Sequence, residues 1–297
     1  MRQSSEDTMT LIPLQIRPSD CDSLDHVNNS AYVAYVQHAV ADRLAGLGFA
    51  TDWSESGPCR WAMQDLAIEY RLASSFGDQL AAQVWLAEAD ALRPVFGCEI
   101  VRRKGDDRQV VVRSQARWQR LEADSGQPVS LPDALLTALA KDAGSRPRPF
   151  RAPEESDSVR RYWWQHRVER AEVGLAGLVH PHVIFEWIEE SVLSASATAG
   201  WPIERCLASD FVVFQMRHDA SFFSQPALGQ EVEITSRLVD VRRLRGTWQN
   251  EIREAADGRL VVNDYSTGVF LNLAGRPTSP PPGMMEALQR PLESEGN

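Results

Sequence analysis

The chain lacks the features that would place it in several large classes of protein. It has four cysteines in 297 residues, far apart and without a Cys-x-x-Cys pair, so no disulfide framework is expected. No apolar run approaches the roughly 18 residues that a membrane helix needs. The opening MRQSSEDTMT is polar and acidic, whereas a signal peptide is basic and then apolar. These absences predict a cytoplasmic protein with reduced thiols and no membrane partner.

The chain also has fewer basic than acidic residues. The chain has 31 Lys and Arg against 41 Asp and Glu, a formal net charge of −10. Binding to nucleic-acid phosphates needs a net basic face, so nucleic acid is not expected as the main partner. The rest of the composition is ordinary, with 43% hydrophobic and 24% charged residues, as in globular proteins. The length allows two domains of ordinary size.

An internal repeat organises the chain. Adding 152 to a position in the first half repeatedly gives a matching residue in the second half, without a gap. Glycines match glycines at helix ends and turns, and aromatic residues match aromatic residues. The pairs include Gly48 with Gly200, Gly77 with Gly229, Tyr70 with Phe222, Phe96 with Trp248 and Trp118 with Phe270. So many matches in one register indicate a tandem duplication.

Each copy predicts a short strand, a loop, one long helix and then several strands. In the first copy, apolar residues at helical spacing predict a helix over about residues 28–47, with strands near 59–72, 79–89, 94–104 and 109–121. This order suggests an α+β fold in which a curved antiparallel sheet wraps around the helix. The predicted domains are 9–143 and 161–275, with a proline-rich and charged linker over 144–160 and a loose tail over 276–297.

The segment SDCDSLDHVNNSAYVAYVQHA, residues 19–39, contains the main candidate site. Three aspartates and a histidine crowd against the start of the predicted helix. At the same offset, Asp22 becomes Gly174 and His26 becomes Leu178. If the cluster only capped a helix, both copies would gain from something like it. The asymmetry predicts one working site per chain.

The residue types in this segment suit acyl chemistry. The first turn of a helix presents unpaired N–H groups and the positive end of the helix dipole, which can hold an oxyanion. A carboxylate such as Asp22 can attack a carbonyl or activate a water, and His26 can contact the substrate or hold the carboxylate. The amides around Asn28 and Asn29 would bind the oxyanion. The pattern indicates hydrolysis of an activated acyl group without a metal.

The stretch DCDSLDHVNNSAYVAY resembles the active-site segment of hot-dog-fold thioesterases, the 4-hydroxybenzoyl-CoA and acyl-ACP thioesterase families. Their segment reads approximately Asp-x-Asp-x-x-x-His-Val-Asn-Asn-x-x-Tyr. The resemblance implies a fused double hot-dog that hydrolyses acyl-CoA or acyl-carrier-protein thioesters and needs no cofactor. It places the catalytic aspartate at Asp22, the histidine at His26 and the asparagine pair at Asn28 and Asn29. Leu24 stands where plant-type acyl-ACP thioesterases have asparagine, so the CoA-thioesterase group fits better.

The second helix contains another candidate. GLVHPHVIFEWIEESVLSA resembles the other hot-dog thioesterase branch, in which His-Gly-Gly opens the helix and an acid follows nine residues after the histidine. Counting from His180 gives Glu189, but proline and His182 replace the two glycines. The glutamates of this helix also follow the spacing of a solvated face, an interpretation that we favour over catalysis. His180 and His182 lack a third ligand at suitable spacing, so no metal site is expected.

The remaining candidates concern the substrate pocket and the loop. Asn29, Tyr32, Tyr35, Trp61 and His180 are predicted to bind substrate, although core packing is an equal or better interpretation for the aromatic residues. Asp20 and Asp25 are expected to form the loop through Asx turns. Cys21 is expected to be inert, because surrounding carboxylates raise the pKa of a thiol.

Two other functions stay open. One is a hot-dog dehydratase or hydratase, although its usual Asp-to-His spacing of five is absent here. The other is an acyl-thioester-binding module without turnover. Arginine-rich hairpins in both copies form a solvated surface by default, or receive CoA phosphates or an acidic carrier protein. The sequence does not disclose the acyl group, the choice between CoA and carrier protein, or whether the fused pair is a monomer or forms a homodimer.

Overall fold

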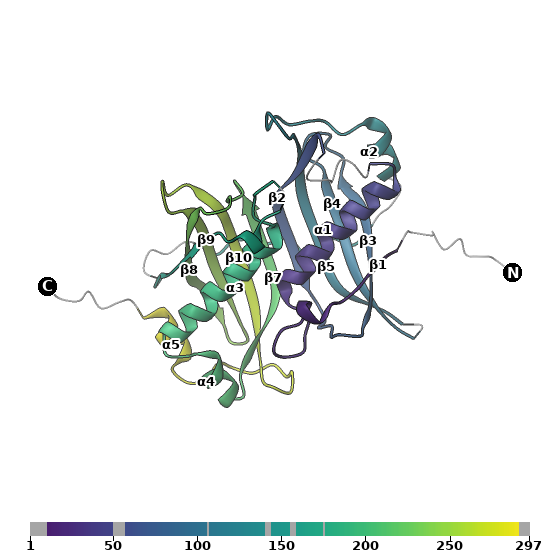
Figure 1. Ribbon diagram of the computed structural model, residues 1–297. Coiled ribbons are helices and arrows are strands. Elements are labelled where there is room, and N and C mark those ends of the chain that lie inside the picture. Colours follow the sequence, from purple (N-terminus) through teal and green to yellow (C-terminus); the bar gives the residue numbers. More distant parts are fainter. Residues whose placement is uncertain are drawn as a thin grey trace. The chain divides into compact units, whose positions relative to one another are not determined.

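The computed structural model describes residues 11–49, 57–105, 107–139, 144–154, 159–174 and 176–290 (Figure 1). The chain divides into two compact units. The first comprises residues up to Met63 together with Tyr70–Pro147, and the second comprises Gln64–Glu69 together with the chain from Arg148 onward. The division after Pro147 falls inside the linker predicted over 144–160.

The first unit contains one long helix and most of five strands. Its elements are β1 (Ile12–Leu14), η1 (Pro18–Asp20), α1 (Asn29–Gly46), β2 (Cys59–Tyr70), β3 (Gln79–Glu88), β4 (Val95–Lys104), β5 (Asp107–Glu122) and α2 (Asp133–Leu139). The strand order is β1-β3-β4-β5-β2, and β1, β3, β4 and β5 pair antiparallel. The helix α1 lies across one face of these strands (Figure 1).

The sequence explains these elements. Apolar side chains at helical spacing along α1, from Tyr32 to Leu44, are buried. The predicted helix over 28–47 is confirmed, because Asn28 is the N-cap and Leu47 the C-cap. The four predicted strands are confirmed to within two residues at every end. The helices α2, α4 and α5 were not expected.

The second unit has the same plan. Its elements are β6 (Tyr162–Arg167), η3 (Arg170–Glu172), α3 (Pro181–Thr198), α4 (Ile203–Ala208), β7 (Val212–Phe222), β8 (Glu231–Arg242), β9 (Arg245–Glu254), β10 (Leu260–Leu271) and α5 (Met284–Gln289). The strands run antiparallel in the order β7-β10-β9-β8-β6, and Asp65–Glu69 of β2 pair with β7. Each unit is thus an antiparallel sheet with one long helix, as predicted.

The duplication is visible in the backbone. The helices α1 and α3 both have 18 residues and start 152 positions apart. Gly48 and its counterpart Gly200 have φ of 90° and 83°, and Gly77 and Gly229 have 95° and 81°. These left-handed conformations favour glycine, which explains why these glycines match between the copies. In the part of the chain that the structure describes, no helix is long and apolar enough to cross a membrane.

The end of the described chain differs from the predicted loose tail. Residues 284–289 form α5, with Met284 and Leu288 buried in the core of the second unit. The hydroxyl of Tyr162 donates to the carbonyl of Leu288 at 3.0 Å. The prediction of a loose tail was therefore wrong for this segment. Two apolar residues four positions apart are enough to dock one short helix, although prolines precede it.

Candidate active site

A tight loop from Cys21 to Val27 precedes α1. Cys21 and Val27 form an antiparallel bridge, and the N–H of Asp22 donates to the carbonyl of His26 at 2.7 Å. Asp25 has a φ of 62°, in the left-handed region that aspartate tolerates better than most residues. The loop therefore reverses the chain and presents Asp22 and His26 on its exposed rim.

Only one of the two carboxylate oxygens of Asp22 accepts hydrogen bonds from the described residues. Its Oδ1 accepts the N–H of Leu24 at 2.8 Å and the N–H of His26 at 3.1 Å. Its Oδ2 has no partner among the described residues. The Asx turn predicted for Asp20 and Asp25 is thus made by Asp22 instead. One oxygen is oriented by two backbone amides, and the other is open to a water or a substrate.

His26 contributes to this geometry through its backbone. Its N–H and its carbonyl both bond to Asp22. Its ring is exposed and bonds to no other side chain in the described part of the chain. The imidazole is therefore free to meet a ligand, and it does not hold the carboxylate.

Asn28 caps the helix. Its Oδ1 accepts the N–H and the hydroxyl of Ser30 at 2.8 and 2.9 Å, and its own N–H donates to the carbonyl of Asp20 at 2.8 Å. The N–H of Ala31 donates back to Asn28. The backbone N–H of Asn29 has no acceptor among the residues that the structure describes. Of the two amides predicted for the oxyanion, the open one is therefore that of Asn29.

Three tyrosines surround the helix start. The hydroxyl of Tyr35 donates to Asp20 at 2.7 Å, and the hydroxyl of Tyr70 donates to the carbonyl of Asn29 at 3.1 Å. The ring of Tyr32 lies 5.9 Å from the rings of both Tyr35 and Tyr70. Burial first, and then the Asp20 acceptor, raises the pKa of Tyr35. Tyr32 and Tyr35 are thus buried beneath the loop, as wall or core.

Trp61 does not lie near the start of α1. It lies near the start of β2, whereas Tyr70 at the other end of the strand contacts the helix start. Nine residues of strand separate them by about 30 Å. The indole of Trp61 packs against Phe96, with ring centroids 6.1 Å apart. Its position favours a core role over a substrate contact.

Cys21 has the surroundings of an inert thiol. Burial is the largest cause that raises its pKa, and Asp25, Asp20 and Asp22 raise it further. The carboxylates were expected from the sequence, and the burial was not. The thiolate population is lowered by both.

The second unit repeats the backbone of the loop without its side chains. The N–H of Gly174 donates to the carbonyl of Leu178 at 3.0 Å, and the N–H of Gly177 to Gly174 at 2.9 Å. Gly177 has a φ of 70°, as Asp25 has 62°. The turn therefore forms without a carboxylate at the position of Asp22. The acid of the first unit is not required by the fold of the loop.

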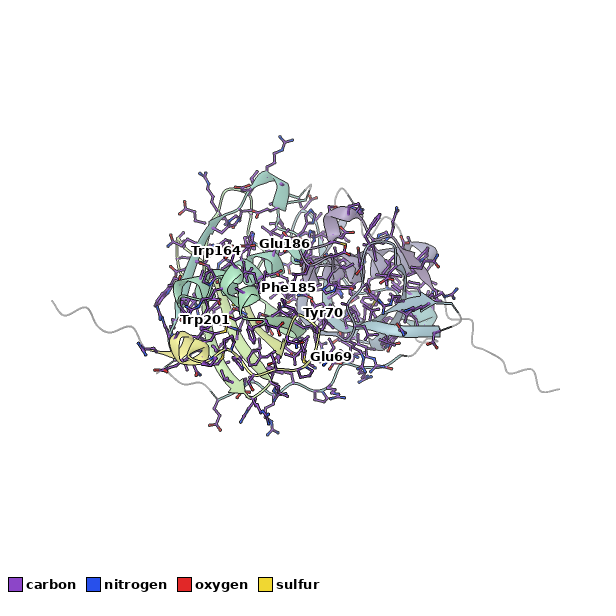
Figure 2. All side chains as sticks on the ribbon, turned by 90° about the horizontal axis from the view of Figure 1, so that it is seen from below. Glu69, Tyr70, Trp164, Phe185, Glu186 and Trp201 are labelled. Carbon is purple, nitrogen blue, oxygen red and sulfur yellow. The ribbon has the colours of Figure 1, made fainter. Side chains whose placement is uncertain are left out.

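His180 and Glu189 both belong to the second unit. His180 is the N-cap of α3 without a side-chain cap bond, and its ring stacks on that of His182 at 5.4 Å. Glu189 is half-buried about 13 Å further along the helix axis. Phe185 and Glu186, labelled in Figure 2, show the two sides of α3, since Phe185 is buried and Glu186 exposed. Within this unit, His180 and Glu189 do not meet.

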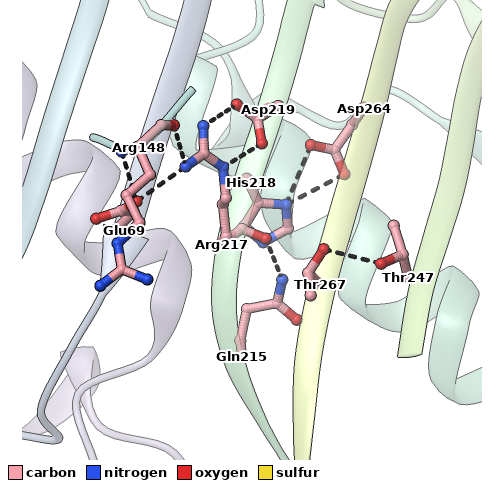
Figure 3. Close-up of polar contacts among 9 residues, drawn as sticks. All are labelled: Glu69, Arg148, Gln215, Arg217, His218, Asp219, Thr247, Asp264 and Thr267. Atoms are coloured by element: carbon pink, nitrogen blue, oxygen red, sulfur yellow. Dashed lines mark hydrogen bonds and ion pairs between the residues drawn. The ribbon is translucent and has the colours of Figure 1, made fainter. Parts of the chain in front are cut away.

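A buried polar network that was not expected from the sequence lies beneath α3. Nδ1 of His218 lies 3.2 and 3.1 Å from the two carboxylate oxygens of Asp264, toward which it points in Figure 3. Asn250 donates to Asp264 at 3.1 Å and accepts from Ser236 at 2.8 Å, and Ser236 bonds to Ser191 at 2.9 Å. At the same offset, the first unit has Leu66, Val112, Cys98, Val84 and Ala39. This exchange of apolar for polar residues was the signal available in the sequence. Across the described ranges, no three His, Cys, Asp or Glu residues are grouped to hold a metal ion.

These features define the class of protein. Two antiparallel sheets, each with one long helix and a loop before that helix, form a double hot-dog fold. Residues 16–139 match the model of the thioesterase-like superfamily, which covers the first unit's loop and helix. The resemblance to hot-dog thioesterases is therefore confirmed.

Solved structures agree over most of the chain. An acyl-ACP thioesterase from Bacteroides thetaiotaomicron is 12% identical, with a TM-score of 0.67 over 88% of this chain and 97% of that one. A putative oleoyl thioesterase from Lactobacillus plantarum is 14% identical, with a TM-score of 0.69 over 89% and 98%. The 12:0-ACP thioesterase from Umbellularia californica is 11% identical, with a TM-score of 0.67 over 86% and 95%. At such identities the likeness establishes the fold.

Proposed function

We propose that the chain is a thioester hydrolase that cleaves acyl thioesters of CoA or of an acyl carrier protein, with its working site in the first unit. One observation carries the proposal. The Asp22 carboxylate has one oxygen fixed by two backbone amides and one open oxygen, in a loop directly before the open Asn29 amide of α1. A carboxylate and an oxyanion donor are the two groups that hydrolysis of a thioester needs without a metal.

In the proposed mechanism, the thioester carbonyl oxygen accepts the N–H of Asn29, and the open oxygen of Asp22 holds a water. Asp22 takes a proton from the water while the water oxygen bonds to the carbonyl carbon. The displaced electron pair moves to the carbonyl oxygen, where the amide and the positive helix end stabilise it. The C–S bond then breaks, the C=O bond forms again, and the thiolate leaves and takes up the proton.

A nucleophilic variant uses the same atoms. The open oxygen of Asp22 would bond to the carbonyl carbon itself, expel the thiolate and form an acyl-enzyme anhydride. A water would then split the anhydride and release the acid. In either variant one oxyanion donor supplies about 2.7–4 kcal/mol of barrier reduction. The exposed ring of His26 is placed to contact the substrate or the departing thiol.

Two findings support this site over one in the second unit, and a third supports the activity. The second unit forms the same loop with Gly174 and Leu178, which provide neither a carboxylate nor an imidazole. The thioesterase-like family model matches residues 16–139. Solved proteins with this fold over their whole length are named acyl-ACP or oleoyl thioesterases.

The test is thiol release from a panel of acyl-CoAs and acyl-carrier-protein thioesters, with wild type beside Asp22→Asn. We expect turnover of at least one thioester by wild type and a loss of at least about 100-fold in Asp22→Asn, because the open oxygen loses its basicity. Asp25→Gly is the matched control. It removes the neighbouring carboxylate and installs the residue that the second unit has at Gly177, so activity should persist. Absence of thiol release from every thioester by folded wild type would refute the proposal.

A further inference from the structure

The strand β6 ends the strand order of the second unit. It pairs with β8 on one side, and no strand that the structure describes pairs with its other side. A strand at the edge of a sheet presents a row of N–H and C=O groups that can pair with another chain. Trp163, Gln165 and Arg167 of this strand are exposed, and the Trp163 side chain is 55% exposed. The edge is therefore accessible to a further strand.

The backbone groups on this edge belong to alternate residues. The N–H of Val168, directly after β6, donates to the carbonyl of Gln230 at 2.8 Å, next to the start of β8. In an antiparallel pair, residues that bond to the neighbouring strand alternate with residues that do not. The residues two, four and six positions before Val168 therefore bond to β8. The N–H and C=O groups of Trp163, Gln165 and Arg167 point away from β8, toward the edge.

The first unit protects the equivalent edge. Its edge strand β1 has three residues, whereas β6 has six. At the offset of 152, Gln165 corresponds to Pro13 in the middle of β1. Proline has no N–H to donate, and natural proteins use it to block the edges of sheets. The fold thus accepts a blocked edge at this place, and the second unit has an unblocked one.

The exposed side chains of β6 and its flanks are complementary to themselves. An antiparallel pair of two copies with its two-fold axis at Gln165 sets Trp163 opposite the partner's Arg167. It also sets Arg161 opposite the partner's Glu169. All four side chains are exposed, and the backbone of Glu169 is extended, with φ of −96° and ψ of 163°. The first contact is a cation–π pair and the second an ion pair across strands.

Charge also selects this register over its neighbour. An axis at Trp164 would set Arg161 opposite the partner's Arg167, and like charges directly opposite each other are destabilising. With the axis at Gln165, the open groups of Gln165 meet those of the same residue in the second copy. The open groups of Trp163 and Arg167 meet each other. Every edge-facing backbone group of the strand then has a counterpart.

We propose that β6 is a dimerisation edge, at which two copies of the chain pair antiparallel about Gln165. The inference does not depend on the proposed function. A strand of six residues is a small interface, so the association is weak and reversible rather than obligate.

Sedimentation of the full chain tests the proposal. We expect wild type to pass from monomer to dimer between about 1 and 300 μM. Gln165→Pro removes the central N–H of the edge and leaves the bonds to β8 intact, as Pro13 does in β1. It should raise the Kd of the dimer at least about tenfold, with an unchanged circular dichroism spectrum. Gln165→Thr keeps the N–H and is the matched control, which should associate like wild type.

Charge exchange tests the register and the intermolecular nature of the contact. Arg161→Glu and Glu169→Arg each set two like-charged pairs across the interface, so each variant alone should associate at least about fivefold more weakly. An equimolar mixture of the two variants restores both Arg–Glu pairs in a heterodimer. The mixture should associate within about threefold of wild type.

Three results would overturn the inference. The first is a wild type that stays monomeric throughout this range, which would leave the edge to an extended segment of another protein. The second is a dimer that Gln165→Pro and both charge variants retain, because it would use another surface. The third is a mixture of the charge variants that associates no better than either variant alone.

Discussion

Asp22 and Gly174 occupy equivalent points of two loops that share their backbone hydrogen bonds. Because Gly174 makes the turn without a side chain, the carboxylate of Asp22 is separable from the folding of the loop. The opposite holds for the acid two positions earlier. Asp20 and its counterpart Glu172 both accept a hydrogen bond from an aromatic residue of the helix, Tyr35 and Trp187 respectively. At the scale of the residue, one acid is retained in both units for structure, and the other is the acid to which we assign the proposed chemistry.

Glu172 should make the stability of the protein depend on pH in the acid range. Burial alone would raise its pKa, but the N–H of Glu169, the His166 ring and the Trp187 indole together lower it. A carboxyl whose folded pKa is depressed contributes stability above its unfolded pKa, near 4.3 for glutamate, which is lost as the pH falls through the folded value. We expect Glu172→Gln to be less stable than wild type at pH 7, and the difference to shrink between about pH 5 and pH 3.

Melting temperatures of wild type and Glu172→Gln across that range provide the measurement. Glu190→Gln, an exposed acid on α3, serves as the control and should follow wild type. A constant difference between wild type and Glu172→Gln from pH 7 to pH 3 would contradict the assignment.

The segment after the division of the chain is fastened to the second unit by a small ionic cluster. The N–H of Arg148 donates to Glu69 at 2.8 Å, and Arg217 donates to the carbonyl of Arg148 at 2.6 Å and to Glu69 at 2.9 Å (Figure 3). Phe150 packs on Tyr265 and beneath the guanidinium of Arg217. Burial raises the pKa of Asp219, and Arg217 opposes that effect. The predicted linker is therefore fixed at defined points.

Arg217→Met should release this segment. The change removes the only cation that bridges Glu69 and Asp219 among the contacts of the described cluster, and it removes the bond to the Arg148 carbonyl. Both carboxylates are half-buried, so the loss of this cation weakens the contacts that hold the segment. We expect chymotrypsin to cut after Phe150 at least about fivefold faster in the variant than in wild type, at a temperature where circular dichroism shows both folded.

Arg245→Met, at an exposed arginine of β9, is the control and should be cut at the wild-type rate. Equal cleavage of Arg217→Met and wild type after Phe150 would show that the cluster does not hold the segment.

The long elements were predictable from the sequence because their signals are local. Apolar periodicity and the Asn-Asn-Ser cap fixed α1, and β-branched runs between turns fixed β2 to β5. The short helices were not predictable, because a helix of six residues such as α5 depends on tertiary packing of Met284 and Leu288 rather than on propensity. The assignment of Gln64–Glu69 to the second unit depends likewise on pairing with β7, which no local pattern encodes.

At the scale of the whole molecule, duplication has been followed by a division of polar groups. The first unit has its polar residues at the start of α1 and apolar residues under the middle of the helix. The second unit has neither acid nor imidazole in its loop, and it buries His218, Asp264 and Asn250 under α3 instead. Asp264 is 0% exposed, so its charge depends on His218 and Asn250 for compensation.

Removing one member of this network should destabilise the protein more than replacing all of its members by apolar residues. His218→Leu alone leaves the fully buried Asp264 carboxylate without its imidazole partner, and we expect a loss of about 3–5 kcal/mol in the free energy of unfolding. Installing the complete first-unit set, with Ser191→Ala, His218→Leu, Ser236→Val, Asn250→Cys and Asp264→Val, should cost less than the single change. Urea unfolding of the full chain measures both. If the variant with all five substitutions is less stable than His218→Leu, the network is not replaceable by the apolar set, and the prediction is contradicted.

The candidate site was predictable in part. The positions of Asp22 and His26 followed from the motif and from its absence in the second copy. Which oxygen of Asp22 is open, and which amide of the helix start is unpaired, follow from backbone geometry that a sequence does not display.

The central claim is that the first unit carries out the chemistry with Asp22. The most direct test is thiol release from the best thioester substrate by Asp22→Asn and Glu189→Gln in the full chain, measured side by side with folding checked by circular dichroism. We predict that Asp22→Asn loses at least about 100-fold in kcat/KM and that Glu189→Gln stays within about threefold of wild type. Loss of activity in Glu189→Gln with activity retained in Asp22→Asn would contradict the claim and move the chemistry to α3.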